Sequence, residues 1–200
     1  FDRAEGASAL KSAVILLLLL LVGCASVPEY ANFAGPEADR AKYLAEHENW
    51  AFSGRIAFSH EGKGGSAQIQ WQQSGAVSDV KISAPLSMGA VRIRFDSENA
   101  QMWDGAGREL RSGKPEVLLQ ELLQMPLPAS TLARGLRAFW PESPEQTAAA
   151  AVGAIAAADW SWQYEGWRDE PVRLPGKIQI QRGQTRLRIV IDQWRELPGG

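Results

Sequence analysis

Residues 66–72 read Ser-Ala-Gln-Ile-Gln-Trp-Gln, and this short stretch decides the fold of the chain. Apolar Ala67, Ile69 and Trp71 alternate with polar residues, so one face of the segment is apolar and the other is polar. A repeat of two residues is typical of an antiparallel strand that rests one face on a core and exposes the other to water. The segment therefore predicts a half-buried β-strand.

The same alternation recurs along most of the chain. It is found in residues 52–58, 79–84, 91–95, 160–164, 177–181 and 185–194, and residues 100–104 and 107–111 indicate a further hairpin. The glycine-rich residues 62–65 predict the turn between the first two strands. Strands that follow one another at such short spacing predict an antiparallel meander.

Helical patterns interrupt the meander. Residues 37–49 predict one amphipathic helix. Pro115 begins a leucine-rich run through residue 123, and proline is favoured in a first helical turn; Ser130 is expected to cap a further helix that extends to Phe139. Residues 146–158 are rich in alanine, which favours a helix, but their place among strands favours a hairpin, and the hairpin is the interpretation we adopt.

These segments predict a mainly β fold with a few helices. A long meander twists and curls, so we expect a strongly curved antiparallel sheet that forms an open, unclosed β-barrel. The helices should form a lid over an apolar cavity on the concave side. The residues expected to line that cavity are Ile69, Trp71, Ile82, Ile93, Phe95, Trp162, Ile178, Ile189 and Ile191. The residues expected on the lid are Leu118, Leu122, Leu132, Leu136 and Phe139. The alternative is a filled core.

The N-terminal segment indicates export. Residues 13–22 are ten consecutive apolar residues, with Arg3 and Lys11 before them. Crossing a bilayer as a helix takes about 20 such residues, so this run fits the apolar part of a secretory signal. Residues 21–24, Leu-Val-Gly-Cys, resemble a bacterial lipobox, in which Cys24 would be lipidated. A single cysteine also has no partner for a disulfide. The alternative is an ordinary signal with an unmodified cysteine.

This gives the expected domain organisation. Residues 1–23 are expected to be a signal peptide, 24–36 the lipidated N-terminus and tether, 37–196 a single half-barrel domain, and 197–200 a C-terminal tail. The formal net charge is only −2, so the sequence predicts no nucleic-acid partner.

The sequence also contains no recognisable catalytic or metal-binding motif. His47 and His60 fall in different predicted elements, and the chain has no metal-ligand spacing. A glycan hydrolase would need two carboxylates across a cleft, whereas Glu142 and Glu145 lie together in a proline-rich loop. We therefore expect a protein that is not an enzyme and needs no cofactor. Its eight tryptophans are compatible with an apolar ligand surface or with plain core packing.

Several segments, in their order, resemble the LolB family of outer-membrane lipoprotein receptors. The segments that carry the resemblance are the lipobox, residues 50–58, residues 69–73, Ala84-Pro85-Leu86 followed by Gly89, residues 104–108, residues 125–128 and residues 174–194. The resemblance covers most of residues 21–194. Two positions depart from the family pattern: Ser87 stands where glycine is usual, and Gly135 stands where tryptophan is usual.

The resemblance implies both a fold and a function. The fold would be an open β-barrel with an apolar cavity that binds acyl chains. The function would be to receive lipoproteins from the periplasmic carrier LolA and to insert them into the outer membrane. The expected partners are LolA, lipoprotein cargo and outer-membrane phospholipid, and the protein is expected to act as a monomer. Leu86, with Met88 as its companion, would form the loop that delivers cargo into the bilayer. The alternative for Leu86 is an ordinary loop leucine tucked against the core.

The residues after Cys24 lack the aspartate that retains related lipoproteins at the inner membrane. The implied location is therefore the periplasmic face of the outer membrane, with Cys24 as the lipid anchor. A second hypothesis is a passive lipid-binding or hydrophobe-binding outer-membrane lipoprotein without specific handover. A third is a structural envelope protein without a cavity.

Overall fold

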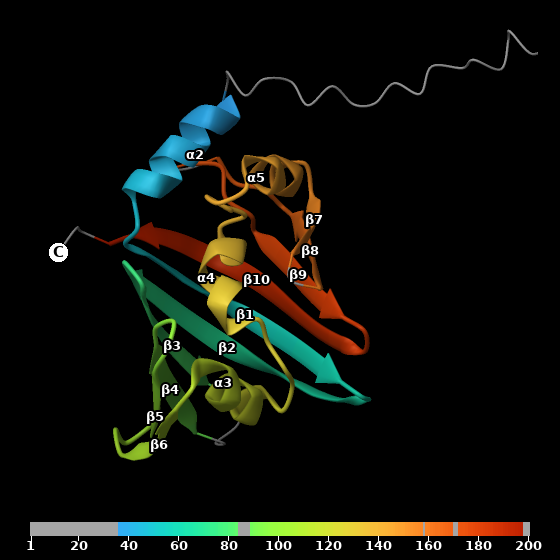
Figure 1. Ribbon diagram of the computed structural model, residues 1–200. Coiled ribbons are helices and arrows are strands. Elements are labelled where there is room, and N and C mark those ends of the chain that lie inside the picture. Colours follow the sequence, from blue (N-terminus) through green and yellow to red (C-terminus); the bar gives the residue numbers. More distant parts are fainter. Residues whose placement is uncertain (1–35, 84–88, 158, 170–171, 198–200) are drawn as a thin grey trace, which may run out of the picture. The chain divides into compact units, whose positions relative to one another are not determined.

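Figure 1 shows a computed structural model of the chain, which describes residues 36–83, 89–157, 159–169 and 172–197. The described elements are α2 (Pro36–Glu46), β1 (Trp50–His60), β2 (Lys63–Ser74), β3 (Val77–Ser83), β4 (Ala90–Phe95), β5 (Ala100–Asp104), β6 (Glu109–Gly113), α3 (Pro115–Leu123), α4 (Ala129–Leu136), α5 (Pro144–Ala151), β7 (Ala154–Ala157), β8 (Trp160–Glu165), β9 (Lys177–Arg182) and β10 (Thr185–Glu196). The signal peptide, Cys24, Leu86 and Met88 lie outside the described residues and stay predictions.

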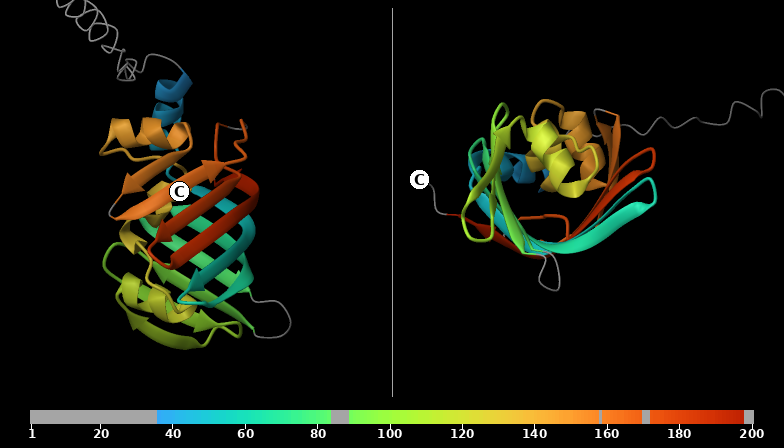
Figure 2. Two further views of the ribbon diagram at one scale, coloured as in Figure 1. Left: turned by 90° about the vertical axis from the view of Figure 1, so that its right-hand side faces the viewer. Right: turned by 90° about the horizontal axis from the view of Figure 1, so that it is seen from below.

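The strands form one antiparallel sheet in the order β6-β5-β4-β3-β2-β1-β10-β9-β8-β7. Neighbours along the chain pair with each other, and the pairing of β1 with β10 joins the two halves. Among the described strands, β6 and β7 each have one neighbour only, so the sheet is not closed. The prediction of a mainly β fold built on an open, curved barrel is confirmed. The right-hand view of Figure 2 shows the curvature of the sheet.

A β-bulge contributes to this curvature. The register between β1 and β10 shifts at Ser53 and Gly54, and a bulge bends the strand that carries it. Gly54 is required there because a Cβ atom at this position would lie 2.3 Å from the carbonyl oxygen of Val190. The extra residue is Asp192 of β10, and the glycine at position 54 of β1 lets the two backbones approach closely beside it.

The helices α3, α4 and α5 belong to residues 114–153, which connect edge strand β6 to the opposite edge strand β7. This segment lies within the concave side of the curved sheet (Figure 2). Chain connectivity therefore places the lid: the crossover from one edge to the other covers the open side. None of the described helices combines the length and the apolar character needed to cross a bilayer.

Three local predictions are corrected. The first turn is confined to Glu61 and Gly62, and the chain is already strand from Lys63, so residues 64 and 65 pair with β1 instead of turning. Helix α4 begins at Ala129 with Pro128 at its N-cap, so Ser130 is an exposed first-turn residue and does not cap the helix.

The alanine-rich segment is not simply a hairpin. Residues 144–151 form helix α5, and only residues 154–157 form strand β7, which pairs with β8. Ser143 accepts a hydrogen bond from the backbone N–H of Gln146, and Pro144 occupies the first helical turn. These are ordinary helix-start signals, and together with alanine propensity they explain why the first part is helical.

Candidate functional site

The candidate site is the concave face of the sheet, defined as the nine residues predicted to line the cavity. Eight of them are buried in one apolar cluster, and Ile82 is partly buried and packs against that cluster; the buried residues are Ile69, Trp71, Ile93, Phe95, Trp162, Ile178, Ile189 and Ile191. They lie on strands from both halves of the sheet. Alternation alone thus identified residues that share one continuous apolar surface.

The lid packs directly on this face. Leu118, Leu132 and Leu136 are buried in the same cluster, and Leu122 is partly buried against it. The backbone of α4 approaches the sheet very closely at Gly135, where a Cβ atom would lie 2.3 Å from the ring of Trp162. The departure from the family pattern at Gly135 therefore has a physical reason: without a side chain at this position, the backbone of α4 packs directly against the Trp162 indole.

Phe139 is not part of the lid face. Helix α4 ends at Leu136, and Ala138 adopts a positive φ of 52°, which turns the chain away from the helix direction. Phe139 therefore packs with Leu44 and Leu174 in a separate small cluster beneath α2. The prediction for this residue is wrong because the helix is shorter than its apolar pattern indicated.

Within the described part of the chain, side chains from the lid fill the concave face. Eight of the nine sheet residues, all except Ile82, are at most 5% exposed. A cavity that admits an acyl chain stays a prediction, and it would require the lid to move.

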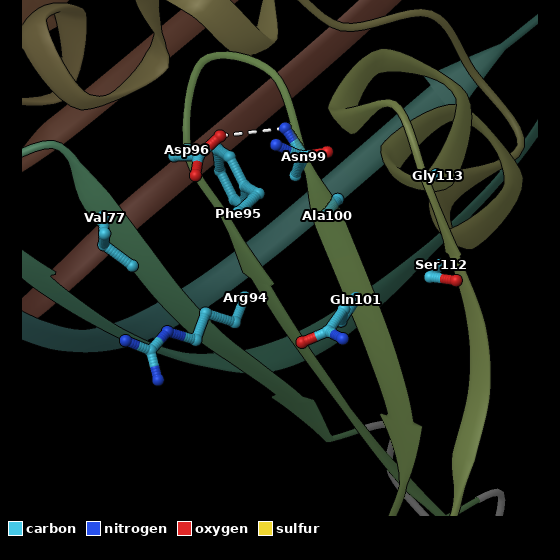
Figure 3. Close-up of a pocket in the computed structure, with 9 residues that line it drawn as sticks. All are labelled: Val77, Arg94, Phe95, Asp96, Asn99, Ala100, Gln101, Ser112 and Gly113. Carbon is cyan, nitrogen blue, oxygen red and sulfur yellow. Dashed lines mark hydrogen bonds between the residues drawn. The ribbon is translucent and has the colours of Figure 1, made fainter.

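A pocket of about 620 Å³ lies elsewhere, around the turn between β4 and β5 (Figure 3). Its lining includes the polar residues Arg94, Asp96, Asn99 and Gln101. The backbone N–H groups of Glu98 and Asn99 lower the pKa of Asp96 by donating to its carboxylate. This polar lining does not suit a hydrocarbon chain.

An aromatic row lies on the concave face, and the predicted cavity lining included its members Trp71 and Phe95 but left out Trp50 and Phe52. Trp50, Phe52 and Trp71 stack with nearly parallel rings, at 6.3 to 6.4 Å between centroids, and Phe95 meets Trp71 edge-on at 5.7 Å. Trp50 and Phe52 are in phase with Ile56 on β1. Their alternation was therefore available as a signal, and it extends the apolar face toward α2.

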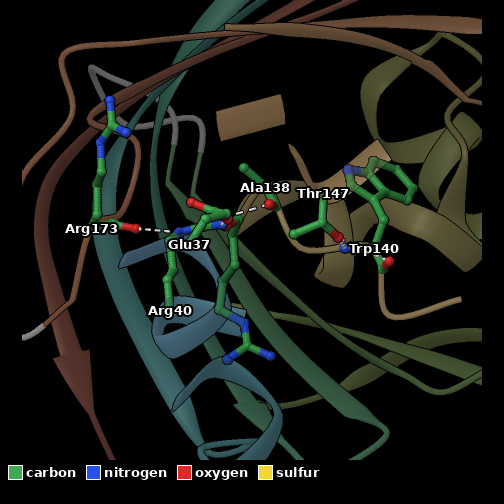
Figure 4. A network of polar contacts seen from close by, with 7 residues as sticks. Glu37, Arg40, Ala138, Trp140, Thr147 and Arg173 are labelled. Atoms are coloured by element: carbon green, nitrogen blue, oxygen red, sulfur yellow. Dashed lines mark hydrogen bonds and ion pairs between the residues drawn. The ribbon is translucent and has the colours of Figure 1, made fainter. Parts of the chain in front are cut away.

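A buried arginine fixes helix α2 to the residues that follow α4 (Figure 4). Arg40, only 2% exposed, donates from Nη2 to the carbonyl oxygens of Arg137 and Ala138 at 2.6 and 3.1 Å. Its Nε donates to the carbonyl of Arg173 at 2.7 Å, and Glu37 supplies the counter-charge at 2.5 Å. One side chain therefore satisfies the carbonyl groups that follow α4.

A second buried arginine reinforces this junction. Arg137 donates to the carbonyl oxygens of Leu44 and His47 at 3.1 and 2.8 Å, and its guanidinium lies 5.3 Å from the ring centroid of Trp50. Burial, together with the nearby positive charge of Arg40, lowers the pKa of Arg137 to about 10. The junction is thus rich in directional hydrogen bonds that hold the C-terminal end of α4.

Arg40→Lys should lower the free energy of unfolding by about 1–2 kcal/mol, because an ammonium group cannot reach carbonyls in three directions as a guanidinium does. Thermal unfolding should show a melting temperature lower by about 3–6 °C. Arg186→Lys, on the exposed outer face, is the control and should have no measurable effect. Equal melting temperatures for the two variants would show that the Arg40 contacts do not stabilise the junction.

The outer face of the sheet carries charge. Arg92, Arg94, Arg186 and Arg188 are exposed, as the alternation predicts. Arg92 pairs with Asp79, donating from Nε at 2.8 Å, and lies 5.7 Å from the ring centroid of Trp103. A pocket of about 310 Å³ adjoins these residues, between Lys81, Ala90 and Gly105. It adjoins the C-terminal part of β3 and the start of β4.

The histidines lie far apart in the fold. His47 follows α2 and contacts the carbonyl of Tyr43 at 2.8 Å, whereas His60 ends β1 and contacts the hydroxyl of Thr185 at 2.7 Å. Among the residues that the structure describes, no cluster of three or more His, Cys, Asp or Glu side chains is arranged to hold a metal ion.

Comparison with known proteins agrees with the resemblance found in the sequence. The family model described as "Outer membrane lipoprotein LolB" matches residues 48–194. A curated relative of that name from Halorhodospira halophila is 32% identical, over 90% of this chain and 92% of its own length. Similar proteins of that name from Xanthomonas oryzae and Xylella fastidiosa are 29% and 28% identical, each over 92% of this chain and over 94% and 92% of their own lengths.

Proposed function

Because the chain belongs to the LolB family of outer-membrane lipoproteins, we propose that it receives lipoproteins from the periplasmic carrier LolA and inserts them into the outer membrane. The acyl chains of the cargo bind the concave face, and the lid helices move aside to admit them. The protein acts as a monomer anchored through lipidated Cys24. It performs no bond chemistry.

The observation that carries this proposal is the pairing of a continuous apolar face with a lid that closes it. The face extends over strands of both halves of the sheet, and the lid is the crossover between the two sheet edges. A surface of this kind binds the acyl chains of the cargo regardless of the amino-acid sequence of the cargo, which suits a protein that handles many different lipoproteins. Burial of about 400 Å² of acyl surface, at about 25 cal/mol per Å², is worth about 10 kcal/mol.

The lid lowers the net affinity for that cargo. Leu118, Leu132 and Leu136 already occupy the concave face, so an acyl chain replaces one set of apolar contacts with another. Binding is therefore strong enough to accept the chain and weak enough to release it. Release into the bilayer then needs no energy source, because the bilayer offers apolar contact without a competing lid.

The membrane end is assigned to the segment that carries Leu86. Residues 84–88 join β3 to β4, and the nearby outer face combines Trp103 with Lys81 and Arg92. Tryptophan with basic side chains is typical of protein surfaces that lie at a membrane–water interface. This combination supports delivery of cargo from that end, in contact with phospholipid.

The test is a transfer reaction with purified components. LolA loaded with an acylated lipoprotein is mixed with the chain carrying Cys24→Ala, so that the acceptor has no lipid of its own, and the cargo on each protein is measured. The expected result is that most of the cargo moves to the acceptor, whereas an unacylated form of the cargo does not. If the acceptor binds free acyl ligands but takes no cargo from LolA, the protein is a passive lipid-binding lipoprotein and the receptor role is wrong.

A further inference from the structure

Three polar groups at one end of the concave face are buried without a hydrogen-bond partner among the described residues. They are the indole Nε1 atoms of Trp140 and Trp162 and the hydroxyl of Tyr164. Their residues are 3%, 0% and 3% exposed. An unpaired buried polar group costs about 1–3 kcal/mol, and native proteins contain few of them. A group of three in one place calls for a physical explanation.

The three side chains form one cluster. Trp162 and Tyr164 are two residues apart on β8 and are both buried on its inner face. The ring of Trp140 meets that of Trp162 edge-on, with 5.4 Å between centroids. Burial raises the pKa of Tyr164, and the nearby Trp140 indole only partly opposes this. Tyr164 is therefore an uncharged hydroxyl, and no hydrogen bond of normal geometry joins it to Trp140.

Among the described residues, the only buried indole N–H groups without a partner are those of Trp140 and Trp162. The indole of Trp71 donates to the side-chain oxygen of Gln73 at 3.1 Å, and Ser78 donates to the same oxygen at 2.8 Å. The indole of Trp194 donates to the carbonyl of Pro175 at 3.0 Å. The indoles of Trp71 and Trp194 thus have acceptors, whereas those of Trp140 and Trp162 do not.

The chemistry of the cluster defines its ligand. An indole N–H can donate but cannot accept, so the ligand must supply acceptor atoms. The surrounding residues include Ile155, Ile178 and Ile180, so the rest of the ligand must be apolar. The nearest buried cation, Arg40, is already occupied by Glu37 and backbone carbonyls, which leaves no counter-charge for an anion. An uncharged carbonyl attached to hydrocarbon meets all three requirements.

We propose that Trp140, Trp162 and Tyr164 bind the carbonyl oxygens of acyl esters, which fixes the depth at which the acyl chains lie in the concave face. The inference rests on the function proposed above and adds a polar recognition element to an otherwise apolar site. A ligand can reach these three groups only when the lid moves, because Gly135 of α4 packs against the Trp162 ring and Trp140 follows α4 in the chain. Moving α4 uncovers the donors and the apolar face in the same step.

Tyr164→Phe tests the proposal because it removes only the hydroxyl. All proteins carry Cys24→Ala. The probes are a synthetic peptide with an S-(diacyloxypropyl)cysteine and its dialkyl ether analogue, which has the same chain lengths but no ester carbonyls. The protein with Tyr164 intact should bind the ester about tenfold more tightly than the ether. Tyr164→Phe should weaken ester binding about threefold to tenfold and leave ether binding unchanged.

The chain offers a matched control. The hydroxyl of Tyr43 is also buried without a partner among the described residues, but it lies on α2. Tyr43→Phe should leave the preference for the ester intact. Neither substitution should lower the melting temperature of the ligand-free protein, because each removes an unpaired polar group.

Each other outcome has a definite meaning. Equal affinity for ester and ether in the parent protein overturns the proposal, while the proposed transport function stands. A lower melting temperature of Tyr164→Phe with an unchanged ester preference also overturns it, because the hydroxyl then serves a buried water. If neither probe binds, the proposed function fails as well. Diacyl phosphatidylethanolamine and its ether analogue identify the source: an ester preference there extends recognition to phospholipid, and its absence restricts recognition to lipoproteins.

Discussion

Gly135→Ala should lower the free energy of unfolding by about 3 kcal/mol, although alanine favours a helix over glycine by about 1 kcal/mol. The new Cβ atom would lie 2.3 to 2.8 Å from three ring atoms of Trp162. That ring is fully buried, so it has no free space to retreat into. The melting temperature should fall by about 6–12 °C. Differential scanning calorimetry on the two proteins measures the change.

A double-mutant cycle identifies the cause. Trp162→Phe removes the part of the ring that meets position 135, so the double variant should be clearly more stable than the sum of the two single changes predicts. Ser130→Ala lies on the exposed side of the same helix and serves as the control for helix propensity. If the changes in unfolding free energy of the two single variants add up to that of the double variant, close packing of Gly135 against Trp162 is not the reason that glycine is needed at position 135.

Leu86→Glu should leave uptake of cargo from LolA unchanged and should slow its deposition in liposomes by about 100-fold. Placing a carboxylate instead of a leucine in the apolar part of a bilayer costs about 3 kcal/mol, and each 1.4 kcal/mol is a factor of about ten. The variant protein should therefore accumulate in the loaded state. Deposition is measured as labelled lipoprotein that floats with the liposomes after incubation.

Two controls separate the position from the charge. Leu86→Met keeps an apolar side chain and should retain activity. Leu110→Glu introduces the same carboxylate at a leucine that is 44% exposed on β6 and should deposit cargo normally. Normal deposition by Leu86→Glu would refute the role of this residue, and slow deposition by both glutamate variants would point to charge alone.

The strands were predictable from the sequence because their signal is local. The alternation of Ile69 and Trp71 with glutamines requires only that one face of a strand is buried, whatever covers it. The same holds for Ile178 on β9 and Ile189 on β10. The curved sheet followed from their number and spacing, and the family resemblance supported it.

The helical region was harder to predict because several short elements compete there. The helix signals Ser143 and Pro144 were present in the sequence, but the edge of the sheet also needs a partner for β8, and residues 154–157 provide it. Phe139 was misplaced because an apolar period continues past the point where Ala138 reverses the chain. The fit of Trp162 on Gly135 and the unpaired donors of the β8 cluster depend on distances between remote residues, and no local pattern reports such distances.

The path of residues 114–153 limits how the protein opens. This segment is attached to the sheet at both ends: β6 ends at Gly113, and β7 begins immediately after Gly153, which has a φ of 129°. The segment stays connected to β6 and β7 when it moves away from the concave face, so a large movement also pulls on these two edge strands. The separation of β6 from β7 and the position of residues 114–153 are therefore coupled, and a cross-link between the two edge strands would immobilise the segment without contacting it.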